Sequence, residues 1–463
     1  MSIEAGLDAP PGSLAREDET PASPALPDRR TANYSLFVLT IVVLLTVVDR
    51  QVLSLMIVPI KADFGVSDTQ AALLIGAAFS LTYAIAGLPI ARIADSRNRR
   101  NIVSICIAFW SAATMACGVA QSYAQMFLCR LCVGVGESGY GPATWSIITD
   151  SYPREKVAFA TGTLAIGSTV GMGLALFAGG AALGLVQHLP TVELPLIGMI
   201  RNWQWAFVIV GAPGLIWSLV VLTTREPARQ GQRAVAKPQS VPVMDVVRQM
   251  RRDWRAYIAV IGGICLQALM SFGPAQWIPT LFHRQFGWEL PRIGMIYGAI
   301  SLICGPLGML FGGKLSERWS RQGHADANLK IMLVGLLVTV PAQVIAPQLP
   351  SPTLMLVLLG VASFTSSMGI GPGIAAFQLI TPSPMRAQVS SVTQFCTNVL
   401  AFALGPLIVA LFTDFLFNDP QKLKYSMSLC IAVLGPLTML LIWQGLKPYA
   451  RSYERAERAL SRP

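Results

Sequence analysis

The sequence predicts an all-α membrane protein with twelve transmembrane helices arranged as two six-helix bundles. Of its 463 residues, 53% are hydrophobic and only 13% are charged, and the mean hydropathy of +0.55 is far above that of globular proteins. Long stretches without Asp, Glu, Lys or Arg recur along the whole chain. A single long polar segment in the interior divides these stretches into two groups of six.

The individual helices follow from length, because a bilayer core about 30 Å thick requires roughly 20 apolar residues per helix. Ten stretches meet this requirement without any charged residue, and two more, 34–60 and 124–149, are equally apolar but are interrupted by charges. In order, the predicted spans are 34–60, 71–91, 102–120, 124–149, 157–186, 203–224, 256–282, 293–313, 331–350, 353–381, 387–413 and 425–446.

The segments outside the spans are polar. Residues 1–33 are rich in Pro, Ala and acidic groups and contain no apolar core typical of a signal peptide, so a disordered cytoplasmic tail is expected. The predicted organisation is this tail, a first bundle (34–224), a cytoplasmic central loop (225–255), a second bundle (256–446) and a second cytoplasmic tail (447–463). Within the loop, 243–255 fits a basic interfacial helix or a solvated linker equally well.

The distribution of positive charge predicts the orientation. With the N-terminus inside, cytoplasmic segments hold 27 of the 35 Lys and Arg residues, and external loops hold six. This bias is the positive-inside rule and places both termini in the cytoplasm of a cell with the chain in its inner membrane. It also accounts for the net charge of +11 without a nucleic acid. The expected partners are therefore the bilayer, protons and a small molecule, with the chain acting as a monomer.

The two halves carry a related loop. Residues 91–100 (ARIADSRNRR) follow the second predicted span, and residues 313–321 (GKLSERWSR) follow the eighth. The acidic residues, Asp95 and Glu317, are separated by about half the chain, which indicates an internal repeat. Both loops resemble the signature of the major facilitator superfamily, so the resemblance implies the major facilitator fold.

In that family the acidic residue of the loop lies against the amino end of helix 11, or of helix 5 for the second copy, where the helix dipole favours negative charge. The arginines brace neighbouring helix ends in the outward-facing state. The resemblance therefore implies a cytoplasmic gate formed by Asp95, Arg99, Glu317 and Arg318.

Four ionisable residues lie within the predicted spans: Asp49, Arg50, Arg130 and Glu137. Asp49 is some 15 residues from the start of its helix and therefore roughly 20 Å deep. Burying such groups in a bilayer costs a few kcal/mol, so they must face a wet cavity or one another. They are the candidate functional residues, although two ion pairs that only join the first and fourth helices would explain the same pattern.

Helix geometry constrains these four side chains. Arg130 and Glu137 are separated by nearly two turns, so they point from one face about 10 Å apart, whereas Asp49 and Arg50 diverge by about 100°. One of the latter two is expected to face the cavity and the other a neighbouring helix. The glycines around Glu137, with Pro142, allow close helix approach and a local break.

Three short sequence runs resemble one particular group within this superfamily. They are Asp49-Arg50, the run from Arg130 through Gly-x-Gly-Glu137 to Tyr140 with Ile148-x-Asp150, and Gly167-Ser-x2-Gly171. These runs resemble the Spinster group, whose animal members are similar to exporters of sphingosine-1-phosphate and lysophospholipids. The resemblance implies proton-linked alternating access, with Asp49 and Glu137 as proton-binding carboxylates and Arg50 and Arg130 as counter-charges that also contact substrate.

The second half offers no ionisable group at membrane depth. Its predicted cavity residues are amides and aromatics: Gln267, Phe272, Phe377, Gln394 and Asn398. A cavity that is charged on one wall and amide- or aromatic-lined on the other suits an amphipathic substrate.

The favoured function is therefore a secondary active transporter that moves a lipid-like or organic anionic substrate with protons. The alternative is a proton symporter for the uptake of small carboxylates. An enzyme is not expected, because the three histidines lie in loops far apart and no nucleophile and base occur together. All eight cysteines lie in apolar spans, so neither a metal nor a redox cofactor is predicted.

Overall fold

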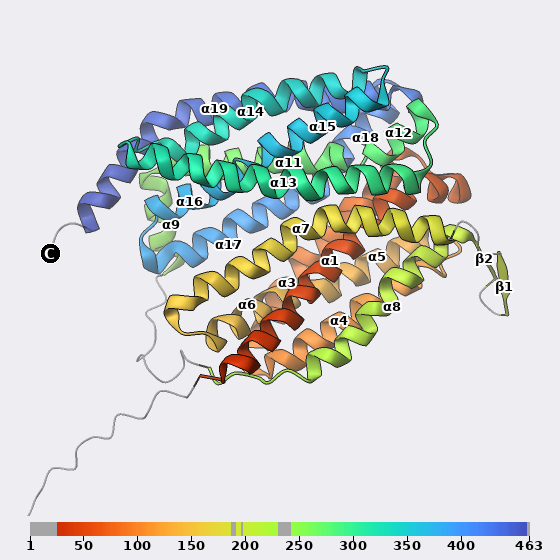
Figure 1. The fold of residues 1–463 in the computed structure, drawn as a ribbon, viewed down its shortest axis with the longest axis horizontal. Coiled ribbons are helices and arrows are strands. Elements are labelled where there is room, and N and C mark those ends of the chain that lie inside the picture. The colour runs from red at the N-terminus through yellow and green to blue at the C-terminus, as the bar shows by residue number, and fades with distance from the viewer. Residues whose placement is uncertain (1–25, 187–190, 196–197, 230–241, 461–463) are drawn as a thin grey trace, which may run out of the picture.

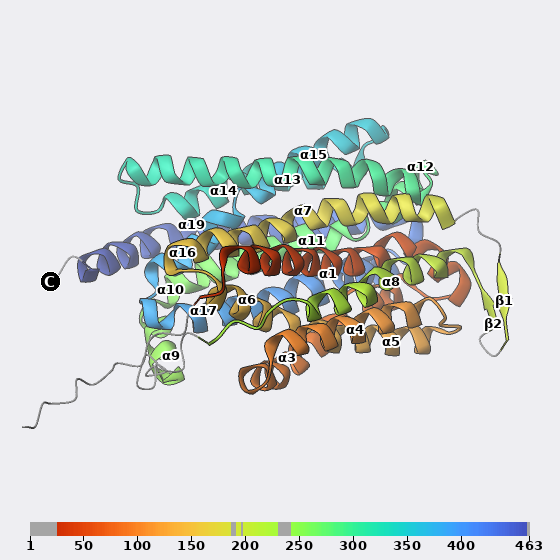
Figure 2. The ribbon, with the colours of Figure 1, turned by 60° about the horizontal axis from the view of Figure 1, so that its bottom comes forward.

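The computed structural model describes residues 26–186, 191–195, 198–229 and 242–460. Long helices run side by side along one axis and are joined by short turns (Figures 1 and 2). We call the end that carries the start of α1 and the end of α19 the tail end. The opposite end, where β1 and β2 form a small antiparallel pair, is called the hairpin end.

The first bundle contains six helical spans, some of them built from more than one element. They are α1 (Arg29–Phe64); α2 (Asp68–Ala72) with η1 (Leu73–Ala77) and α3 (Ala78–Ser96); α4 (Arg99–Cys117); α5 (Tyr123–Glu137) with α6 (Tyr140–Ser151); α7 (Arg154–Val186); and, after β1 (Val192–Leu194) and β2 (Gly198–Ile200), α8 (Asn202–Leu222).

The second bundle repeats this arrangement after a short helix, α9 (Val243–Arg252). Its spans are α10 (Trp254–Tyr257) with η2 (Ile258–Gly262), α11 (Gly263–Ala275) and α12 (Ile278–Phe286); α13 (Leu290–Arg321); α14 (Ala327–Ile345) with η3 (Ala346–Gln348); α15 (Pro352–Ser367) with α16 (Ile370–Ile380); η4 (Ser383–Met385), α17 (Arg386–Thr397), η5 (Asn398–Leu404), α18 (Gly405–Leu411) and η6 (Phe412–Leu416); and η7 (Pro420–Lys422) with α19 (Leu423–Leu460).

The predicted spans are confirmed as helices. Ten of the spans are long and apolar enough to cross a membrane, counted over the described residues. The other two are the α5–α6 run, which carries buried charges, and α7, whose part 170–186 is apolar. The chain is thus an all-α, multi-pass membrane protein.

Some boundaries differ from the prediction. Helix α1 begins at Arg29, five residues before the expected start at 34, because the Asp28 carboxylate caps it by accepting hydrogen bonds from the Thr31 hydroxyl and the Thr31 amide. These hydrogen bonds also lower the pKa of the Asp28 carboxyl. Helix α19 continues to Leu460, well past the expected end at 446. Within the segment 243–255, residues Val243–Arg252 form a helix, which ends before Asp253.

The two bundles are packed together at the hairpin end. One apolar cluster contains side chains of both bundles, among them Leu55, Leu176, Trp277 and Ile293. Helices α7 and α13 approach so closely there that a Cβ atom on Gly294 would lie 2.9 Å from the Cα of Gly180. Toward the tail end the same two helices diverge (Figures 1 and 2).

Candidate transport site between the two bundles

The neighbours Asp49 and Arg50 of α1 face different surroundings, as helix geometry predicts. Asp49 is buried toward α4 and α5: the Thr114 hydroxyl donates to Asp49 Oδ1 at 2.5 Å, and Arg130 Nη1 lies 3.8 Å from Asp49 Oδ2. Arg50 points toward the second bundle, where its guanidinium carbon lies 5.8 Å from the ring centroid of Phe402 on η5. Arg50 is therefore the member of the group that contacts both bundles.

Glu137, at the end of α5, is the partner of Arg50. Its carboxylate is fully buried, and Glu137 Oε2 accepts from Arg50 Nε at 2.8 Å with Arg50 Nη2 at 2.7 Å. Two guanidinium nitrogens thus converge on one carboxylate oxygen. A charge-assisted contact of this kind is among the stronger hydrogen bonds in proteins.

The ion pairs therefore cross between helices. Ion pairs that join the first and fourth predicted spans were the alternative that the sequence left open, and the structure contains two such pairs. Residues two turns apart on one face are about 10 Å apart, too far for an ion pair, and adjacent residues diverge. The observed pairs, Arg50 with Glu137 and Arg130 with Asp49, each join α1 to α5.

The two ion pairs together form a four-residue centre. Some of its buried polar atoms have no hydrogen-bond partner. Within the described part of the chain, Glu137 Oε1, Asp49 Oδ2 and the Nε and Nη1 atoms of Arg130 are buried without a hydrogen-bond partner. The 3.8 Å contact between Arg130 and Asp49 is an ion pair but is too long for a hydrogen bond. Buried polar atoms without partners are rare in folded proteins, so their concentration at this centre singles it out as a candidate functional site.

An aromatic platform surrounds the Arg50 guanidinium, and sequence reasoning did not identify it. The guanidinium carbon lies 4.5 Å from the ring centroid of Phe79 and 5.3 Å from that of Tyr83, both on α3. The spacing of Phe79 and Tyr83 could have indicated this platform, because residues four positions apart lie on the same face of a helix. Such rings stabilise a cation through their quadrupoles while leaving it free to bind an anion.

Glycines place α5 close to its neighbours, as predicted. A Cβ atom on Gly136 would lie 2.8 Å from the backbone nitrogen of Trp110, so a larger residue would push α4 away. Helix α5 ends at Glu137, and α6 begins at Tyr140 after a short turn. The helix break therefore lies directly beside the buried carboxylate.

The predicted cavity residues of the second bundle lie in surroundings that differ from one residue to the next. Phe272 stacks edge-on against Phe402 with ring centroids 4.1 Å apart, and so lies near Arg50. Gln394 is exposed and donates to Asn398 Oδ1 at 2.8 Å.

The other two predicted cavity residues make contacts within the second bundle. Gln267 donates to the carbonyl of Ser366 within its own bundle, at 2.8 Å. Phe377 is buried in the apolar core of the second bundle. In this conformation the packing of α11 and α16 takes up both side chains.

The predicted gate residues lie at the tail end. Arg99 is buried within the first bundle, where it contacts Asp150 at 2.5 Å and Glu226 at 2.8 Å. Glu317 pairs with Arg321 on its own helix, and both are exposed. Arg318 lies on the last turn of α13. The side chain of Asp95 lies outside the described residues, so the gate remains a prediction.

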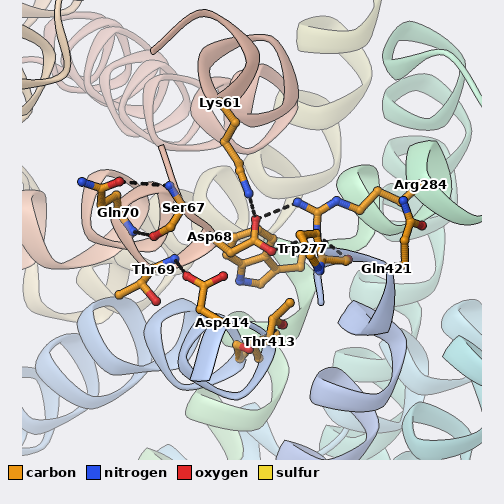
Figure 3. A network of polar contacts seen from close by, with 12 residues as sticks. Lys61, Ser67, Asp68, Thr69, Gln70, Trp277, Arg284, Thr413, Asp414 and Gln421 are labelled. Atoms are coloured by element: carbon orange, nitrogen blue, oxygen red, sulfur yellow. Dashed lines mark hydrogen bonds and ion pairs between the residues drawn. The ribbon is translucent and has the colours of Figure 1, made fainter. Parts of the chain in front are cut away.

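A second polar network holds the bundles together at the hairpin end (Figure 3). The fully buried Asp68, at the start of α2, accepts from Lys61 of the same bundle and from both terminal nitrogens of Arg284 in the second bundle, at 2.7 and 2.9 Å. The Thr69 amide donates to Asp414 of η6 at 2.6 Å. Sequence reasoning counted Lys61 and Arg284 only as external-loop charges and missed this network.

These features define the class of protein. Two six-helix bundles, packed together at one end and diverging at the other, carry buried charges near mid-length where the bundles meet, which is the architecture of a secondary transporter. The chain belongs to the Major Facilitator Superfamily, because the model of that family matches residues 39–406.

Known proteins refine this assignment. The chain is 26% identical to an MFS-type efflux pump of Mycolicibacterium smegmatis (91% of this chain, 94% of the relative). It is 24% identical to the sphingosine-1-phosphate transporter SPNS2 of Mus musculus (86% of this chain, 74% of the relative). A solved bacterial homologue of the human lysosomal transporter Spinster, in an inward-facing and unoccupied conformation, superposes with a TM-score of 0.76 at 26% identity (93% of this chain, 99% of that chain). The protein is thus a Spinster-like secondary transporter.

Proposed function

We propose that the protein moves an amphipathic, anionic or lipid-like substrate by alternating access and couples this movement to protons. The observation that carries the proposal is the position of Arg50. It is held by the buried carboxylate of Glu137 on one side and lies near Phe402 of the second bundle on the other. A change in the protonation of Glu137 would therefore change how the first bundle meets the second.

The coupling follows from general electrostatics. Loss of water favours the protonated form of a carboxylate, and a nearby guanidinium favours the ionised form. If Arg50 leaves Glu137 to bind an anionic substrate, the fully buried carboxylate loses its counter-charge and takes up a proton. Asp49 and Arg130 form a second exchangeable pair, already stretched to 3.8 Å. A ligand or proton shifts the conformational equilibrium only if it binds the two states differently, and these exchanges supply that difference.

The substrate class is supported by the surroundings of Arg50. A partly exposed guanidinium among Phe79, Tyr83 and Phe402 offers a cation for an acidic head group and aromatic faces for an apolar portion. The hydrogen-bonded amides of Gln394 and Asn398 add polar groups on the second bundle. The mouse relative is a sphingosine-1-phosphate transporter, and its substrate belongs to this class.

The proposed orientation places the tail end in the cytoplasm and the chain in the inner membrane. The charge distribution supports this orientation, because most Lys and Arg residues lie in tail-end segments. The structure, with its hairpin end closed, then corresponds to a carrier closed to the outside.

The test is transport in proteoliposomes with an imposed pH gradient. We expect labelled sphingosine-1-phosphate or a lysophospholipid to move only when the gradient is present, and Arg50→Ala to abolish the movement. Gradient-driven uptake of a small carboxylate such as gluconate, with no lysolipid transport, would establish the alternative symporter. Equal lysolipid movement with and without the gradient would refute proton coupling.

A further inference from the structure

A small basic hollow lies at the tail end, away from the transport site. It encloses about 160 Å³ between the start of α10 and the last turns of α19. Four arginines line it, together with one acid and a few neutral residues: Arg252, Asp253, Trp254, Arg255, Ala256, Pro448, Arg451, Ser452 and Arg455.

Asp253, the one acidic residue that lines the hollow, already has hydrogen-bond partners within the protein. Asp253 Oδ1 accepts from Arg455 at 2.5 Å and from the Ser452 hydroxyl at 3.0 Å, and Asp253 Oδ2 accepts from Gln249 at 3.1 Å. Asp253 therefore neutralises Arg455 and fixes α19 to the start of α10.

The positive charges of the other three arginines are not neutralised by an acidic side chain among the described residues. Arg252, Arg255 and Arg451 are exposed and form no ion pair among the described residues. The nearby Glu454 lies 3.6 Å from Arg458 instead. The hollow thus presents three guanidinium groups with no acid left to balance them, so its electrostatic field attracts anions.

The hollow lies at the level expected for lipid head groups. Trp254 is the first residue of the membrane-crossing segment Trp254–Phe286 and is about half exposed. Tryptophan at a span end is typical of the interface between lipid and water. The adjoining α9 exposes Val243, Met244 and Val247 beside its arginines, the pattern of a helix that lies in this interface.

We propose that the hollow binds the phosphate of an anionic phospholipid from the leaflet at the tail end. Arg252, Arg255 and Arg451 surround the phosphate, because guanidinium groups bind phosphate oxygens in bidentate geometry. The lipid's apolar portion contacts Trp254, which lines the hollow. A lipid rather than a soluble phosphate is the occupant because the exposed Trp254, at the end of a membrane-crossing segment, lines the same hollow. The bound lipid joins α9, α10 and α19 at the membrane surface.

The test is lipid retention measured by native mass spectrometry of the full-length protein, titrated with phosphatidylglycerol or phosphatidylcholine in detergent. We expect the wild type to retain phosphatidylglycerol preferentially. Arg252→Gln with Arg451→Gln should weaken its affinity roughly 30-fold, since each arginine near a charged surface contributes a factor of about five. The paired Lys substitutions should restore much of the affinity, because they keep the charge.

The matched control is Lys156→Gln, which removes an exposed tail-end cation from the first bundle. It should leave retention unchanged. Equal retention by the Arg252 and Arg451 double variant and the wild type would overturn the proposal. Displacement of the lipid by inorganic phosphate or glycerol 1-phosphate at similar concentrations would overturn the lipid assignment, because it would show a site for soluble anions.

Discussion

Arg50 on α1 and Glu137 at the end of α5 form a buried ion pair in which two guanidinium nitrogens lie 2.7 and 2.8 Å from one carboxylate oxygen. The second Glu137 oxygen is buried without a partner in the described structure. Among the described residues Arg50 is thus the ionic partner that hydrogen-bonds to Glu137, while Arg130 and Asp49 lie close enough to act on the carboxylate electrostatically. Arg50 also faces the second bundle, where its guanidinium carbon lies 5.8 Å from the ring centroid of Phe402.

The first prediction concerns proton coupling. Glu137→Gln mimics the protonated carboxylate, so it should abolish gradient-driven transport and shift the conformational equilibrium at high pH in the direction that acidification shifts the wild type. Lowering the pH from about 8 to 5 spans the range in which a desolvated carboxylate titrates. The measurement is the distance distribution between spin labels on α1 and α12, followed through this pH range.

Asp49→Asn should reproduce another part of the same shift, because it leaves Arg130 without its counter-charge. The double variant of Asp49 and Glu137 provides the decisive comparison. If it still responds to pH and still transports against a gradient, the four residues only join helices and coupling lies elsewhere.

The second prediction concerns stability. Arg50→Ala leaves a fully buried carboxylate without a counter-charge, and removing one partner of a buried ion pair costs about 3–5 kcal/mol. The melting temperature should fall markedly at pH 8 and less at pH 5, where protonation removes the buried charge. Arg321→Ala breaks an exposed pair with Glu317 and should change the melting temperature little at either pH. Equal losses for the two variants would contradict the importance of the buried pair.

The third prediction concerns the hairpin end. Asp68→Asn removes the charge that holds Lys61 and Arg284, so this end should open more often. Spin labels at the exposed positions Ala62 and Asn418 should report a longer mean distance or a new long-distance population. Arg284→Lys keeps one ionic contact and should have a smaller effect, because lysine cannot make the bidentate contact. An unchanged distribution in Asp68→Asn would remove this network from the closing mechanism.

The fourth prediction concerns topology. A reporter fused after residue 228 should be active only in the cytoplasm, and one inserted at Asn418, at the hairpin end, only outside. Both results depend on the charge bias and not on the tertiary structure. A cytoplasmic Asn418 would reverse the proposed orientation while leaving the fold unchanged.

The sequence by itself determined the twelve spans, the division into two bundles, and the four ionisable residues at membrane depth. Hydrophobic length and the cost of buried charge are local properties, so they can be read without knowing how helices pack. The same reasoning placed Asp49 and Arg50 on different faces, because adjacent helical residues always diverge.

Only the tertiary structure decided which charges are partners. The crossed pairs, the Phe79 and Tyr83 platform under Arg50, and the contact of Asp68 with Arg284 each depend on the relative rotation and depth of helices far apart in the chain. Helical periodicity fixes the face on which a side chain lies but not the neighbour that face meets. The packing of α1 against α5, and of one bundle against the other at the hairpin end, supplies that information.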